Sequence, residues 1–275
     1  MRINTNLAAL NAWRSLTFNN AGMTRSLEKL SSGFRVNRAA DDAAGLAVSE
    51  KMRAQIRGLN MAVRNAQDGV SMIQTAEGGA QKIQDMLQRM RELAVQANSG
   101  TLSSGDRDLL DKEFQQLITE IDRTASSTKF NNITLISSSN SAAAIQVGPG
   151  TSTTDDQVTV AFNNTKLDKT SLGIGSLDIK NTTNATASIT ALDTALNSVN
   201  TYRADFGAYQ NRLENAISTL QTQVENLTAA ESRIRDVDMA QEMAVFTKFQ
   251  ILQQASTAML AQANQSTQSI MGLLR

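Results

Sequence analysis

The sequence predicts a mainly α protein, a long antiparallel helical hairpin or coiled coil with a small β-containing tip. Three observations support this fold class. The 275 residues include a single proline, Pro149, which leaves long helices uninterrupted. Apolar residues recur at steps of three and four over most of the chain. Aromatic residues make up only 4% of the chain, so we expect aliphatic, alanine-rich packing.

The first predicted helix spans about residues 3–34 and carries one apolar stripe. The stripe consists of Ile3, Leu7, Leu10, Trp13, Leu16, Asn20, Met23, Leu27, Leu30 and Phe34. These spacings of three and four place all of them on one face of a helix. Such a stripe needs a partner.

The expected partner is the C-terminal helix, whose seam alternates steps of four and three, as in a coiled coil. The seam consists of Val245, Phe249, Leu252, Ser256, Met259, Ala263, Ser266, Ile270 and Leu273. We expect the two terminal helices to pair with each other and then with copies of themselves. Two ordinary amphipathic helices in a globular bundle remain the alternative.

The middle of the chain predicts two antiparallel helices. The first follows Asp41 and Asp42, which can cap a helix N-terminus, and continues to about Asn98. Residues 101–105 read as a turn, and a 3.6-residue period resumes from Asp106 to about Thr128.

The only β-like zone follows Phe130, where Ser, Thr and Asn become frequent. Short alternating pieces at residues 145–147 and 157–162 predict strands and hairpins. A helical period returns near Ser188 and continues to about Ala230.

Composition excludes most catalytic chemistry. The chain has no His and no Cys, which removes imidazole bases, thiolate nucleophiles and the usual zinc ligands. Oxygen-only metal sites remain possible, but the acidic residues are scattered along helices. We therefore expect no enzyme, and no catalytic, cofactor-binding or metal residues.

Charge and hydropathy argue against two classes of partner. Lys and Arg equal Asp and Glu at 26 each, so there is no net positive field for nucleic acid. No apolar run is long enough to span a membrane, and residues 1–6 lack the apolar region of a secretory signal peptide.

Specific motifs resemble the bacterial flagellins. Residues 30–37, Leu-Ser-Ser-Gly-Phe-Arg-Val-Asn, and 40–47, Ala-Asp-Asp-Ala-Ala-Gly-Leu-Ala, are similar to the N-terminal signature of that family. Residues 203–213, 231–238 and 250–255 match its C-terminal half, although Thr267 stands where many flagellins carry proline. The resemblance covers nearly everything except roughly 137–187.

The resemblance implies a domain plan and a role. Residues 1–40 and 233–275 would form an inner coiled-coil domain, residues 41–136 and 188–232 a helical rod domain, and residues 137–187 the tip. Copies would assemble into a helical filament of the bacterial flagellum that gives motility. The alternative is a hook-filament junction protein or another coiled-coil structural protein.

The resemblance also implies partners and a location. The chain would be secreted unfolded by type III export and fold at the filament tip, with an export chaperone, a filament cap and hook-junction proteins as partners. We expect residues near 1–40 and 235–275 to be mobile before assembly, because a lone subunit buries too little surface there.

Two sets of site residues follow. The set expected to pack between subunits is Ile3, Leu7, Leu10, Leu16, Leu27, Leu30, Phe249, Leu252, Met259, Ile270 and Leu273. Residues 87–96 resemble the flagellin stretch that toll-like receptor 5 binds on monomers, with expected contacts at Arg89, Leu93, Gln96 and Glu113. The same surface packs subunit to subunit in family filaments, which alone would account for these residues.

Overall fold

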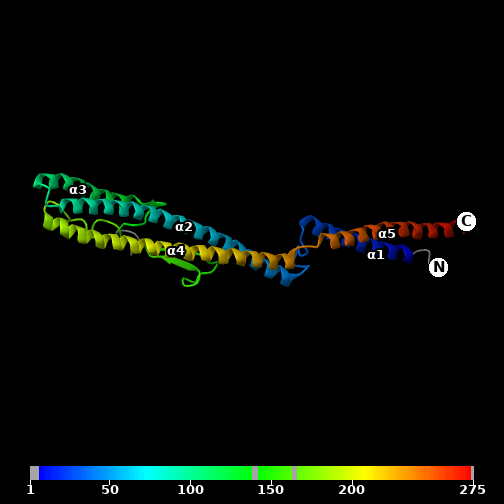
Figure 1. The fold of residues 1–275 in the computed structure, drawn as a ribbon. Coiled ribbons are helices and arrows are strands. Elements are labelled where there is room, and N and C mark those ends of the chain that lie inside the picture. Colours follow the sequence, from blue (N-terminus) through cyan, green and yellow to red (C-terminus); the bar gives the residue numbers. More distant parts are fainter. Residues whose placement is uncertain (1–5, 138–141, 163–165, 274–275) are drawn as a thin grey trace. The chain divides into compact units, whose positions relative to one another are not determined.

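The computed structural model describes residues 6–137, 142–162 and 166–273, and the side chains of residues 267–273 lie outside the description. Long helices dominate it, which confirms the mainly α fold class (Figure 1). They are α1 (Leu7–Ser32), α2 (Ala43–Ala97), α3 (Ser104–Ser127), α4 (Thr182–Arg235) and α5 (Met239–Leu273). The chain divides into two compact units, residues 1–56 with 225–275 and residues 57–224.

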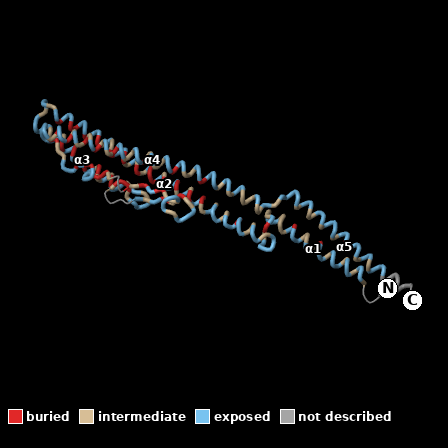
Figure 2. Tube along the Cα trace, turned by 90° about the horizontal axis from the view of Figure 1, so that it is seen from below, coloured by how far each residue is buried: buried red, intermediate tan, exposed pale blue. Residues whose placement is uncertain are grey.

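The unit of residues 57–224 is a helical bundle in which α3 lies alongside α2 and α4 (Figure 1). Each helix contributes large, fully buried side chains, and buried residues gather where the three helices run together (Figure 2). The core includes Ile73, Ile83, Leu87, Met90 and Leu93 of α2, Phe114 and Ile121 of α3, and Leu192, Val199, Phe206 and Leu213 of α4.

The turn between α2 and α3 is held by local hydrogen bonds. Ser103 and Asp106 form a capping box at the start of α3, which satisfies amide groups that the first helical turn leaves open. Arg107 donates to the carbonyl oxygens of Ala97 and Ser99, at 2.8 Å each, at the end of α2. These bonds hold the antiparallel reversal that the turn signal predicts.

Two short strand pairs occur in the described residues. Strands β1 (Lys129–Phe130) and β2 (Ile133–Thr134) form a tight antiparallel hairpin, and β3 (Ala143–Gln146) pairs antiparallel with β4 (Gln157–Val160). The sequence predicted strands near the positions of β3 and β4 but not the first hairpin.

The β3–β4 segment lies against the sides of α2 and α4. Ile145 packs over the backbone of Gly69. A Cβ atom added to Gly69 would lie only 2.5 Å from Cδ1 of Ile145. The side-chain amide of Asn65 donates to the carbonyl oxygen of Gln146 at 3.3 Å, and the rings of Phe162 and Phe206 lie 5.9 Å apart. The α2–α3 turn, at residues 98–103, rather than this segment, forms the end of the bundle (Figure 1).

The unit formed by the chain ends contains α1 and α5, which pack antiparallel. Asn6, which caps α1, also donates to the carbonyl oxygen of Ala263 at 3.0 Å, and Lys29 lies 4.0 Å from Glu242 at the opposite end of the pair. Asp238 accepts hydrogen bonds from the amides of Ala240 and Gln241 at the start of α5. Among the described residues, no helix combines the length and apolar character that crossing a membrane requires.

Candidate functional site

Small and polar residues occupy the centre of the face of α1 that meets α5. Asn19 and Ser26 are the buried residues of α1, seven positions apart on one face. Gly22 lies between them, directly under the ring of Phe249, where a Cβ atom would lie only 2.5 Å from Cζ. The absence of a side chain at Gly22 therefore lets α5 approach the backbone of α1 closely.

Asn19 makes the central polar contact of this pairing. Its side-chain amide donates to Ser256 Oγ at 2.9 Å and approaches the carbonyl oxygen of Leu252 at 3.4 Å. The Ser256 hydroxyl in turn donates to the carbonyl oxygen of Leu252 at 2.7 Å. Both side chains are buried, so this network satisfies polar groups that would otherwise be costly inside the seam.

The predicted apolar stripe of α1 is only partly covered. Leu7 is 67% exposed, Leu10 48%, Trp13 60% and Leu27 56%, whereas Leu16 and Leu30 are half-buried. The expectation that α5 covers this stripe is therefore wrong for the four exposed residues. Periodicity locates an apolar face but does not tell which neighbour covers it, and here the closer approach of small residues decides the pairing.

On α5 the predicted seam is divided between inner and outer surfaces. Ser256 is buried and Phe249 is half-buried, while Leu252 and Met259 are exposed. Ile3 lies outside the described residues, as do the side chains of Ile270 and Leu273. Sequence reasoning missed Asn19, Gly22 and Ser26, although the seven-residue repeat of small or polar residues from Ala12 through Asn19 to Ser26 was a signal for Asn19 and Ser26.

A cluster around Arg235 joins the connector that follows α1 to the connector that precedes α5. The amide of Arg35 donates to the carbonyl oxygen of Arg235 at 2.6 Å, and the amide of Val237 donates to that of Gly33 at 3.0 Å. The guanidinium of Arg235 lies 4.7 Å from the centre of the Phe34 ring and bonds Glu50 at 2.6 Å. We call Phe34, Glu50 and Arg235 the connector cluster.

The charges near these connectors mostly find partners within the chain. Arg38 pairs with Glu28 at 2.8 Å, and Asp42 caps α2 by accepting from the amide of Gly45. The hydrogen bond from Arg235 holds the pKa of Glu50 below its usual value of 4.5. These contacts stabilise the connectors.

A second candidate surface lies on α2 in the helical bundle. Arg89 bonds Glu113 of α3 at 3.0 Å and Glu92 at 3.1 Å, and these hydrogen bonds, with that to Glu113 the stronger cause, raise the pKa of Arg89. Gln96 is exposed, but Leu93 is 0% exposed in the bundle core. The buried side chain of Leu93 is therefore not available for direct contact with a partner in this structure, and the prediction of such a contact is wrong.

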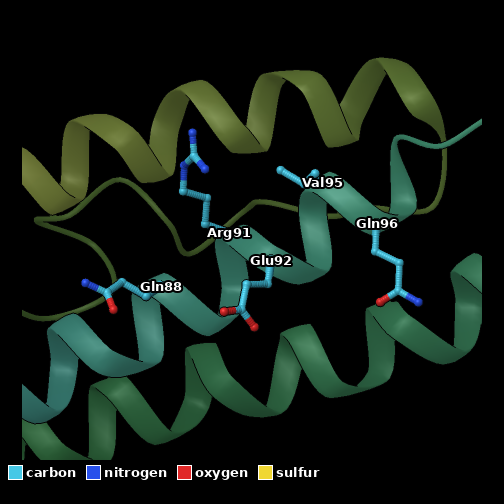
Figure 3. A pocket seen from close by; sticks show the side chains of 5 residues that line it. All are labelled: Gln88, Arg91, Glu92, Val95 and Gln96. Carbon is cyan, nitrogen blue, oxygen red and sulfur yellow. The ribbon is translucent and has the colours of Figure 1, made fainter.

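An open depression on the same surface extends along α2. It is lined by Gln88, Arg91, Glu92, Val95 and Gln96. Figure 3 shows Arg91 and Val95 pointing toward α4, whereas Glu92 and Gln96 point toward α3. Arg91 bonds Asp193 of α4 at 2.6 Å, so this arginine also ties the helices together. Among the residues described, no group of three or more acidic side chains is placed to hold a metal ion.

Family comparison agrees with this arrangement of helices. The family model for the bacterial flagellin N-terminal helical region matches residues 3–141, and that for the C-terminal helical region matches residues 189–274. The chain belongs to the bacterial flagellin family. The matched segments contain α1, α2, α3, most of α4 and all of α5, so the contacts between α1 and α5 lie in the family's shared regions.

Individual flagellins match over the whole length. The flagellin of Halalkalibacterium halodurans is 50% identical over 277 residues, with all of both chains covered. The flagellar filament 33 kDa core protein of Treponema phagedenis is 48% identical over 290 residues, again with both chains fully covered. The crystal structure of Bacillus cereus flagellin is 35% identical, covers 61% of this chain and 94% of its own, and superposes with a TM-score of 0.51.

Proposed function

We propose that this chain is the structural subunit of a bacterial flagellar filament, and that copies contact one another through the apolar stripe of α1. One observation carries the proposal: α5 leaves Leu7, Leu10, Trp13 and Leu27 exposed, although they form one stripe on a long helix. Large apolar side chains gathered on a surface mark a contact with another molecule. Relatives named as flagellins and as filament core proteins support a second copy as that molecule.

Burial of the stripe supplies the driving force for assembly. Each fully covered large apolar side chain contributes roughly 1.5–3 kcal/mol, before the cost of ordering the chain. Contacts that pair one surface with a different surface on the next copy extend as an open helix when the rotation between copies does not close a ring. A helical filament follows from such contacts.

Secretion to the outside of the cell agrees with the composition. The chain has no cysteine, so it cannot form disulfides on leaving a reducing cytoplasm. Its single proline leaves little slow isomerisation to delay refolding after export. An export chaperone, a filament cap and hook-junction proteins belong to the same proposal.

Seeded elongation tests the filament role. Purified protein is mixed with sheared filament fragments, and electron microscopy follows length while limited proteolysis follows the terminal helices. We expect long filaments, with the termini becoming protected as they grow. Particles that stay soluble under every seeding condition, with termini protected throughout, would contradict the proposal and fit a hook-filament junction protein.

Charged substitutions test the contact surface. Leu10→Glu and Leu27→Glu place a carboxylate on the exposed stripe, and we expect each to slow elongation at least tenfold because a buried charge is costly. The control is Ile133→Glu, which changes an equally exposed apolar residue in the β1–β2 hairpin. Equal inhibition by all three variants would show that the contact surface is not confined to α1.

Recognition of the free subunit by toll-like receptor 5 is proposed at the surface of Arg89, Glu113 and Gln96. Arg89 and Glu113 are about half exposed and form an ion pair, which offers both charges to a partner. We expect Arg89→Ala to weaken binding to the purified receptor ectodomain roughly tenfold, the size of a moderate interface contribution. Arg123→Ala is the matched control, since Arg123 forms a similarly exposed pair with Glu120 on α3. Equal loss in both variants would place the binding surface elsewhere.

A further inference from the structure

We infer that the register of α1 against α5 is set by two side-chain fits, Asn19 with Ser256 and Gly22 with Phe249. The apolar repeat does not set it. Both fits lie in the middle of the seam, and each pairs a residue of α1 with a chemically matched residue of α5. Asn19 and Gly22 are thus positioning residues for the terminal helices.

One row of the α5 seam, made only of apolar residues, does not distinguish one register from the next. Val245, Leu252 and Met259 are seven residues apart, so a slide of one heptad replaces one apolar residue by another. A register that depended on this repeat alone would be degenerate.

A one-heptad slide separates both central fits. Asn19 would then face Phe249 or Ala263 in place of Ser256, and its buried amide would lose its side-chain acceptor. Gly22 would face Ser256 or Glu242, leaving the Phe249 ring without the gap that now receives it. The slide would therefore break both contacts at once, the hydrogen bond of Asn19 and the close fit at Gly22.

Contacts at both ends of the pair agree with the same register. Asn6 reaches the carbonyl oxygen of Ala263 at one end, and Lys29 meets Glu242 at the other. Neither of these end contacts is buried as deeply as Asn19. We therefore assign the selection of register to the central contacts at Asn19 and Gly22. A single buried polar residue specifies the register of coiled coils in the same way.

The register matters for assembly, and this step rests on the proposed filament role. It decides which exposed residues of α1 lie beside which exposed residues of α5, such as Asn11 and Met259, which line one groove. Copies in different registers would present different surfaces and could not repeat one contact along a filament. Selection of one register in every copy is therefore a condition for regular growth.

Cysteine cross-linking can test the register, because the chain has no cysteine of its own. Ala12→Cys with Met259→Cys reports the observed register, because the contacts of Asn6 with Ala263 and of Gly22 with Phe249 place residue 12 level with residue 259. Ala12→Cys with Leu252→Cys or Ser266→Cys reports slides of one heptad in either direction. A short bifunctional maleimide is applied to soluble protein and to seeded filaments, and the intrachain product is quantified by denaturing electrophoresis and peptide mass.

In the otherwise unchanged protein we expect the cross-link yield of the 12–259 pair to exceed the yields of the 12–252 and 12–266 pairs, which report the shifted registers. Asn19→Leu should lower its yield at least threefold, and the exchange Asn19→Ser with Ser256→Asn should restore it by rebuilding the polar pair. Gly22→Ala should lower the yield as well, with recovery when Phe249→Leu is added. Thr17→Leu, which adds the same apolar side chain on the exposed side of α1, is the control and should leave the yield unchanged.

Equal yields from the three cysteine pairs in the unchanged protein would overturn the inference. So would an unchanged 12–259 yield in both Asn19→Leu and Gly22→Ala. Failure of the unchanged protein to extend seeds would instead contradict the filament role, and the cross-linking of soluble protein would still decide the register.

Discussion

Asn131 and Asn132 form the two-residue turn of the β1–β2 hairpin with positive φ angles of 46° and 65°. Two-residue hairpin turns favour this left-handed geometry because it matches the twist of the strands, and Asn followed by Gly fits it best. Asn132 therefore occupies a position where glycine has less strain.

We predict that Asn132→Gly raises the free energy of unfolding by about 0.5 kcal/mol, because it relieves that strain. Chemical denaturation of the soluble protein measures the change. Asn200→Gly is the control, since this exposed residue lies within α4, where glycine lowers stability by a few tenths of a kcal/mol. Stabilisation by both variants, or by neither, would contradict the argument from the turn.

Glu50 gives the connector cluster a dependence on pH. Its pKa lies below the usual value of 4.5 because Arg235 donates a hydrogen bond to the carboxylate. A carboxyl group with a lowered folded-state pKa stabilises the fold above its unfolded pKa, and that contribution is lost as the pH falls through the folded value.

We therefore predict that Glu50→Gln lowers stability at pH 7 and that its difference from the unchanged protein shrinks as the pH falls below about 4.5. Denaturation midpoints between pH 7 and pH 2 measure it, with the exposed Glu225→Gln as control. A difference that is independent of pH would exclude the ion pair with Arg235 as its cause.

At the scale of helices, glycines in α2 decide where the irregular segments pack. A Cβ atom at Gly79 would lie 2.7 Å from Thr128 Oγ1 and 2.9 Å from Ile136 Cδ1, whereas nothing lies within 4 Å of the equivalent position at Gly78. These neighbouring glycines have the same helical backbone and opposite surroundings. The absence of a side chain at Gly79 lets the segment after α3 lie directly on α2.

We predict that Gly78→Ala stabilises the protein by about 0.5–1 kcal/mol, because alanine is the better helix former. Gly79→Ala should instead destabilise it by roughly 1–3 kcal/mol through overpacking. Thermal unfolding of the two variants measures the contrast. Stabilisation by Gly79→Ala would mean that the segment at Ile136 moves away at little cost.

At the scale of the whole molecule, Trp13 is a built-in reporter of assembly. It is the only tryptophan in the chain, it is 60% exposed, and it belongs to the uncovered stripe of α1. Burial against another copy would replace water around the indole ring with apolar atoms.

We predict that the fluorescence maximum of Trp13 shifts to shorter wavelength as seeded filaments grow, in proportion to the sedimented protein. Leu10→Glu, which should slow growth at least tenfold, supplies the control, because its emission should stay near the value of the soluble subunit over the same time. Filaments that sediment while the emission stays unchanged would place Trp13 on a water-facing surface of the polymer.

The sequence alone determined the helices of this protein and its family. Periods of three and four residues, the capping residue Asp42, the turn at residues 101–105 and the near absence of proline act over one or two helical turns, so they can be read directly. The flagellin motifs were equally readable. The β1–β2 hairpin was not predicted, because strands of two residues are too short to show alternation.

Only the tertiary structure decided which faces meet. The small residues Asn19 and Gly22 meet α5, the stripe of Leu7, Leu10 and Trp13 stays exposed, and Leu93 is buried in the bundle. A periodic pattern shows that a helix has an apolar face, but burial depends on which distant segment approaches most closely. Gly22 and Phe249 show the reason: a close fit between residues far apart in the chain places α5 on one part of α1 and leaves the rest of the stripe exposed.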